Sequence, residues 1–121
     1  MSALKLVIVD DDDLIRSVIR DVAHEALPAA EITEHNSATY ALHDVETGTV
    51  DLLITNCHMP DMDGPTLVKT LRDHKHSLPI IMVSGSEDAQ QLGELAGIDR
   101  FVPKHLLHLN LEEAIFGLLA S

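Results

Sequence analysis

Four short apolar segments of this chain are each followed by side chains that could do chemistry. Four consecutive acidic residues, Asp10 to Asp13, follow the first, and Asn56 follows another. Ser84 and Lys104 follow the two later segments. Two neighbouring carboxylates can hold a hard dication such as Mg²⁺, and a dication with a lysine can neutralise a phosphoryl group. The set indicates phosphoryl chemistry, with Asn56 where an Asp nucleophile would complete an acyl-phosphate site.

The pattern of apolar residues predicts the elements that bring these side chains together. Short apolar runs alternate with amphipathic stretches five times, which predicts an α/β fold with a parallel sheet covered on both faces. Ligands of such sheets bind at the carboxyl ends of the strands. The expected strands are 4–9, 31–35 (an edge strand), 50–55, 79–83 and 100–102. Five helices are expected. Three of them begin after a capping residue, which is Asp12 or Asp13 for the first helix, Asp63 for the third and Asn110 for the fifth. The second helix covers 38–46, and the fourth covers 87–96.

Length and composition limit the classes of protein. The chain has 121 residues, which predicts a single domain over 1–121. Its formal net charge is −12, so we expect no basic surface of the kind that a direct nucleic-acid contact needs. One cysteine, Cys57, is typical of a reducing compartment, and no apolar stretch approaches the ~20 residues of a membrane helix. We therefore expect a cytoplasmic protein that contacts neither nucleic acid nor membrane.

Four segments in a fixed order and spacing carry a family resemblance. They are Val7-Ile8-Val9-Asp10-Asp11, then Asp51 to Ile54 with Met59 to Gly64, then Ile80 to Gly85, and finally Gly97 to Lys104. From Leu4 to Leu119 the chain resembles the receiver domain of response regulators in two-component phosphorelay signalling. The resemblance implies a flavodoxin-like (βα)5 fold with a doubly wound parallel sheet of order 2-1-3-4-5. It also implies a signalling module that is not an enzyme.

The resemblance assigns roles to individual positions. Asp11 would bind Mg²⁺, Asp10 would act through water, and His58 would offer its backbone carbonyl. The implied metal set is Asp10, Asp11, Asn56 and His58. The implied switch and phosphoryl-binding set is Ser84, Phe101 and Lys104, in which Phe101 would swing between two positions. A lone Phe at a strand end is also an ordinary core residue, so both interpretations of Phe101 stay open.

Position 56 departs from the family pattern. The acceptor lies three residues before the Met-Pro pair, here Met59-Pro60, so an Asn stands where the family has Asp. An amide is neutral and a very poor nucleophile, so no acyl phosphate is expected there and Mg²⁺ affinity should fall. His105 is a second departure, because the family usually has proline after the lysine.

Three functional hypotheses are consistent with these residues. The first is a pseudo-receiver that is not phosphorylated at position 56 and acts through protein contacts. The second is an ordinary phospho-accepting receiver that carries an Asp-to-Asn substitution. The third is a haloacid-dehalogenase-like phosphatase, whose Asp-x-Asp pattern Asp10 and Asp12 match while Leu14 takes its Thr position.

The resemblance also implies partners. A sensor histidine kinase or a phosphotransfer protein would be the upstream partner of such a domain. In this family, the face formed by the fourth helix, fifth strand and fifth helix often mediates dimers, and the sequence permits a homodimer there.

Overall fold

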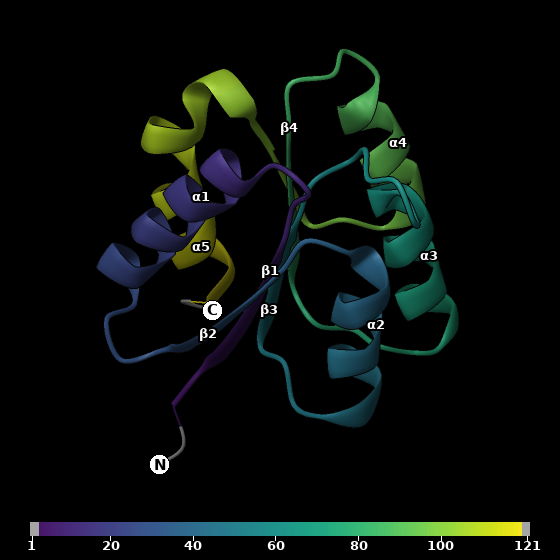
Figure 1. Ribbon diagram of the computed structural model, residues 1–121, viewed down its shortest axis with the longest axis horizontal. Helices are drawn as coiled ribbons and strands as arrows, with labels where there is room; N and C mark the ends of the chain where they lie inside the picture. Colours follow the sequence, from purple (N-terminus) through teal and green to yellow (C-terminus); the bar gives the residue numbers. More distant parts are fainter. Residues whose placement is uncertain (1–2, 120–121) are drawn as a thin grey trace.

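Five parallel strands form the centre of the structure, a computed structural model that describes residues 3–119. They lie in the order β2-β1-β3-β4-β5, which confirms the expected fold (Figure 1). The strands are β1 (Lys5–Val9), β2 (Glu31–His35), β3 (Leu52–Thr55), β4 (Ile80–Ser84) and β5 (Arg100–Pro103).

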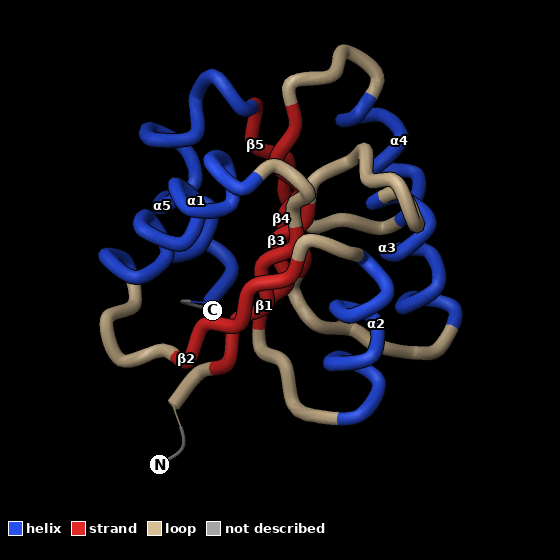
Figure 2. Tube along the Cα trace, in the orientation of Figure 1, coloured by secondary structure: helices blue, strands red, loops and turns tan. Residues whose placement is uncertain are grey.

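Helices cover both faces of this sheet (Figure 2). One face carries α1 (Asp13–Ala26) and α5 (Leu107–Leu119), and the other carries α2 (Ala38–Thr47), α3 (Gly64–Asp73) and α4 (Ala89–Ala96). A short 3₁₀ helix, Lys104–Leu106, links β5 to α5. Within residues 3–119, none of the helices combines the length and the apolarity needed to cross a membrane.

Aliphatic side chains fill the two layers between sheet and helices. Every residue of β3 and β4 is buried, as expected for central strands covered on both faces. In β2 the exposed and half-buried residues alternate at first, which suits an edge strand. The buried strands give the polar residues at their carboxyl ends a rigid base.

Local capping signals identify the start of two helices correctly and of one helix wrongly. Asp12 accepts hydrogen bonds from the backbone N–H groups of Leu14 and Ile15 at 3.0 and 3.1 Å, and Asp63 caps α3 in the same way. The expected cap at Asn110 is wrong, because α5 already begins at Leu107. Leu107 and Leu111 lie one turn apart and are both buried, so their packing extends the helix through Asn110.

Candidate functional site

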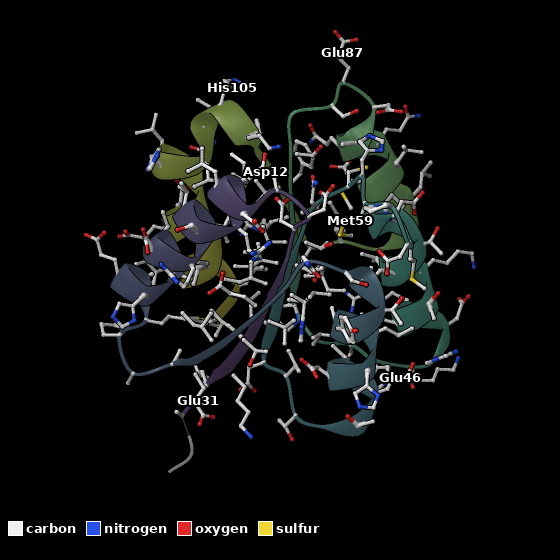
Figure 3. The ribbon with its side chains drawn as sticks, in the orientation of Figure 1. Asp12, Glu31, Glu46, Met59, Glu87 and His105 are labelled. Carbon is white, nitrogen blue, oxygen red and sulfur yellow. The ribbon has the colours of Figure 1, made fainter. Side chains whose placement is uncertain are left out.

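The carboxyl ends of β1, β3, β4 and β5 meet at one edge of the sheet. Val9 pairs with Thr55, and Ser84 pairs with Pro103, so the residues that come after these pairs are neighbours. In Figure 3 the labelled Asp12 follows β1 and Met59 follows β3 at this edge, whereas Glu31 and Glu46 lie at the opposite end. The sheet therefore gathers the polar residues that the sequence predicted at one edge.

Asn56 is at the centre of the acidic side of this edge. Its side chain is buried, and its amide nitrogen Nδ2 donates to the His58 carbonyl at 3.0 Å. The same nitrogen lies 3.4 Å from a carboxylate oxygen of Asp10 and 3.4 Å from one of Asp11. The amide oxygen Oδ1 accepts the backbone N–H of Cys57 at 2.8 Å. This bond fixes which end of the amide faces the carboxylates.

The two acids next to Asn56 differ in their surroundings. Asp10 is fully buried, and its Oδ1 accepts the backbone N–H of Asp12 at 2.9 Å. Its other oxygen, Oδ2, is buried without a hydrogen-bond partner. Burial raises the pKa of Asp10, and the hydrogen bond from Asp12 and the charge of Lys104 oppose this effect. Asp11, in contrast, is exposed.

Ser84 and Lys104 form the other side of the edge. Ser84 is buried, and its hydroxyl accepts the backbone N–H of Ser86 at 3.2 Å. The Lys104 side chain lies next to Gly85: a Cβ added to this glycine would lie 3.7 Å from the Cβ of the lysine. Among residues 3–119 no carboxylate oxygen lies within 4.0 Å of the Lys104 ammonium. The structure brings this lysine to the site without an ion pair.

Phe101 and His58 lie around this centre. Phe101 is half-buried and packs against a small cluster of Cys57, Met82 and Ala89. The ring of His58 is exposed, and its Nε2 lies 3.2 Å from the Ser86 hydroxyl, which donates to Asp88 at 2.5 Å. A polar chain thus connects the loops after β3 and β4.

The sequence did not predict that the Gly64 backbone packs directly against the backbone of Asn56 and Cys57. The Gly64 N–H donates to the Cys57 carbonyl at 2.6 Å. An added Cβ on Gly64 would lie only 2.1 Å from the Asn56 backbone oxygen, so the loop tolerates no side chain there. The Asp63-Gly64-Pro65 segment could have suggested a close approach.

Asp61 is a second residue that the sequence did not single out. Its carboxylate accepts the Ser37 hydroxyl at 2.6 Å and the Thr39 hydroxyl at 2.7 Å, which joins the loop after β3 to the start of α2. These bonds, led by that from Ser37, hold the pKa of Asp61 well below its usual value. Because the partners are 22 to 24 residues away, no local signal marks this contact.

The donor set fits a magnesium ion only in part. Carboxylate oxygens of Asp10 and Asp11 and the His58 carbonyl are hard donors that converge on one point, and Asp10 Oδ2 is left without a partner. No three side chains of His, Cys, Asp or Glu within residues 3–119 could hold a metal together. The Asn56 amide nitrogen is at the point of convergence, and a nitrogen that carries two hydrogens is not a ligand.

Comparison with known proteins identifies the family. Residues 6–116 match the model of the response regulator receiver domain. The chain is 32% identical over 121 residues to the cyclic di-GMP phosphodiesterase response regulator RpfG of Xanthomonas campestris, covering 96% of this chain and 32% of that protein. It is 30% identical over 116 residues to the chemotaxis protein CheY of Pseudomonas aeruginosa, covering 93% of each. The chain thus spans about a third of RpfG and nearly all of CheY.

Solved structures agree with this match. A putative response regulator from Chloroflexus aurantiacus superposes with a TM-score of 0.89 at 30% identity, covering 99% of this chain and all of that one. The chemotaxis protein CheY4 of Vibrio cholerae has a TM-score of 0.83 at 24% identity, which supports the fold alone. Together with the sheet order and the family match, these similarities show that the chain belongs to the response regulator receiver domain family.

Proposed function

We propose that this receiver domain accepts no phosphoryl group at position 56 and signals through protein contacts instead. Receiver domains are generally non-enzymatic modules of two-component signalling. The observation that supports the proposal is the chemistry and hydrogen bonding of the Asn56 side chain. Its amide is neutral, buried and hydrogen-bonded at both ends, so it offers no nucleophile for phosphoryl transfer.

The rest of the site keeps the donors that phosphoryl chemistry needs. Asp10, Asp11 and the His58 carbonyl would hold Mg²⁺, more weakly than a site with a third carboxylate at position 56. When bound, this ion would neutralise negative charge at the edge of the sheet. We propose that the Ser84 hydroxyl donates a hydrogen bond to an anionic group and that the Lys104 ammonium neutralises the charge of that group. Phe101, half-buried beside Cys57, is the aromatic that could change position when a partner binds.

Exposed apolar side chains on α4 and α5 suggest where this domain contacts other proteins. On α4, Leu95 is 79% exposed, and on α5, Leu109 is 73% exposed. We propose that the α4-β5-α5 face binds a partner or a second copy, and that a histidine kinase or phosphotransfer protein is the upstream contact. A cytoplasmic location stays a prediction from the sequence.

Intact-mass measurement after incubation with Mg²⁺ and acetyl phosphate tests this function. The wild-type chain should show no phosphoryl adduct, whereas Asn56→Asp should gain one. A stoichiometric adduct on the wild type would overturn the proposal.

The same variant tests the hypothesis of an ordinary receiver with a single substitution. If Asn56→Asp also takes no phosphoryl group, that hypothesis is wrong and the site has diverged further. The family match favours either receiver hypothesis over a haloacid-dehalogenase-like phosphatase. Steady hydrolysis of a phosphate ester, lost in Asp10→Ala, would restore the phosphatase hypothesis.

A further inference from the structure

We propose that the Asn56 amide takes the place of the metal ion, so that Mg²⁺ has to displace it to bind. The proposed function depends on the missing nucleophile and is independent of this inference, which depends on the cation position. The acidic residues of this domain would be held together by a hydrogen-bond donor that the chain itself supplies.

The distances support a donor at the centre of an oxygen-lined site. Nδ2 of Asn56 lies 3.0 Å from the His58 carbonyl oxygen and 3.4 Å from one oxygen each of Asp10 and Asp11. These oxygens come from two loops, after β1 and after β3, and without a positive group between them the two carboxylates would repel each other. The partial positive charge of the NH₂ group reduces this repulsion.

The opposite orientation of the amide is unfavourable. The Cys57 backbone N–H points at the Asn56 oxygen at a distance of 2.8 Å. Rotation by 180° would place the NH₂ group against this N–H and turn the amide oxygen toward two carboxylates. The NH₂ group would then face the Cys57 N–H, and the amide oxygen would face the buried carboxylate of Asp10, which is costly because neither pair can form a hydrogen bond. Asn56 is therefore held as a donor toward the acids and does not offer them a metal-binding oxygen.

Burial makes the amide a competitor of the ion. Asn56 Nδ2 lies 3.4 Å from Asp10 Oδ1, and both residues are buried, so an ion bound to this oxygen at about 2.1 Å would collide with the amide. Two explanations of weak Mg²⁺ binding can now be separated. If Asn56 only lacks a charge, its removal leaves Mg²⁺ affinity unchanged or lower. If the amide occupies the cation position, its removal raises the affinity.

Mg²⁺ titration of three variants distinguishes these explanations. Binding of Mg²⁺ alone is measured by calorimetry and by the shift in melting temperature for wild type, Asn56→Ala and Asn56→Asp, with the exposed Asn36→Ala as control. We expect Asn56→Ala to bind Mg²⁺ at least about fivefold more tightly than wild type, and Asn56→Asp more tightly still. Asn36→Ala should match the wild type. Equal or weaker binding by Asn56→Ala would overturn the inference.

A spectroscopic measurement on the wild type covers the case in which Asn56→Ala does not fold. The two side-chain amide protons of Asn56 should exchange slowly with solvent in ¹⁵N spectra. Their signals should stay unshifted until the Mg²⁺ concentration at which the protein begins to bind it, and then change together with the Asp10 and Asp11 backbone signals. Fast exchange, or Mg²⁺ binding that leaves the Asn56 signals unchanged, would contradict a displaced amide. A phosphoryl adduct on Asn56 would refute the proposed function but not this inference.

Discussion

The two sides of the carboxyl edge satisfy their polar groups in different ways. On the acidic side, formed by Asp10, Asp11 and Asn56, hydrogen bonds link the side chains to one another and to the loops. On the lysine side, formed by Ser84 and Lys104, the lysine makes no ion pair with any residue of 3–119.

This difference shows which side of the edge is held together by contacts within the domain. The acidic side contains its own hydrogen-bond donor, the Asn56 amide, although Asp10 Oδ2 stays without a partner. The lysine side keeps a charge that acts on Asp10 only over a distance and makes no ion pair within residues 3–119. Substitutions on the acidic side should therefore affect stability more than substitutions on the lysine side.

The largest effect is expected from Gly64→Ala, on the acidic side. The Cβ of the new alanine would lie 2.1 Å from the Asn56 backbone oxygen and 3.1 Å from Cys57 Cα, so the backbone at one of these positions must move. We expect a loss of about 3 kcal/mol or more in the free energy of unfolding, measured by urea denaturation. The matched control is Gly85→Ala on the lysine side, whose nearest neighbour lies 3.7 Å away, with a change within about 0.5 kcal/mol. Equal losses would remove the contrast between the two sides.

A second effect is expected from Asn56→Asp in the presence of a chelator. The change replaces a donor with a carboxylate that faces Asp10, Asp11 and the His58 carbonyl. We expect the free energy of unfolding to fall by about 2 kcal/mol, because a hydrogen bond is lost and like charges meet in a buried place. Added Mg²⁺ should restore it, as measured by thermal melting. Unchanged stability in the chelator would mean that the amide contributes nothing to the acidic side.

A smaller, pH-dependent effect is expected from Asp61→Asn. The bonds from Ser37 and Thr39 hold the pKa of Asp61 below its unfolded value of about 3.9, so its charge stabilises the fold above that pH. We expect a loss of about 1 kcal/mol at pH 7. The loss decreases as the pH falls below about 4, because the unfolded wild type takes up a proton on Asp61 there, whereas the folded protein, with its lower pKa, does so only at still lower pH.

Denaturation midpoints of wild type and Asp61→Asn at several pH values check this. The exposed Glu87→Gln is the control for a change in net charge. A difference that stays constant down to about pH 2 would show that the charge of Asp61 is not the cause.

The smallest effect is expected from Lys104→Ala, on the lysine side. Because the ammonium makes no ion pair within residues 3–119, the free energy of unfolding should change by less than about 0.5 kcal/mol. Urea denaturation at pH 7 measures it. A loss above about 1.5 kcal/mol would show that Lys104 is engaged in the fold and would remove the distinction between the two sides.

The sequence predicted the elements and the edge that carries the site. Apolar runs and short polar caps are local signals, so they identified the five strands, the cap at Asp12 and the cap at Asp63. The family resemblance supplied the strand order, and the spacing to Met59-Pro60 identified Asn56 as the unusual residue. The failed cap at Asn110 marks the limit of such signals, because burial of Leu107 overrode a local preference.

Only the tertiary structure decided what the Asn56 side chain does. Its amide nitrogen meets carboxylates 45 and 46 residues away in the chain, and the Cys57 N–H selects its orientation. The contact between Asp61 and Ser37 and the close approach of Gly64 likewise depend on loops that meet in space. An asparagine in a sequence has both a donor and an acceptor, and only the surrounding atoms determine which of them faces the acids.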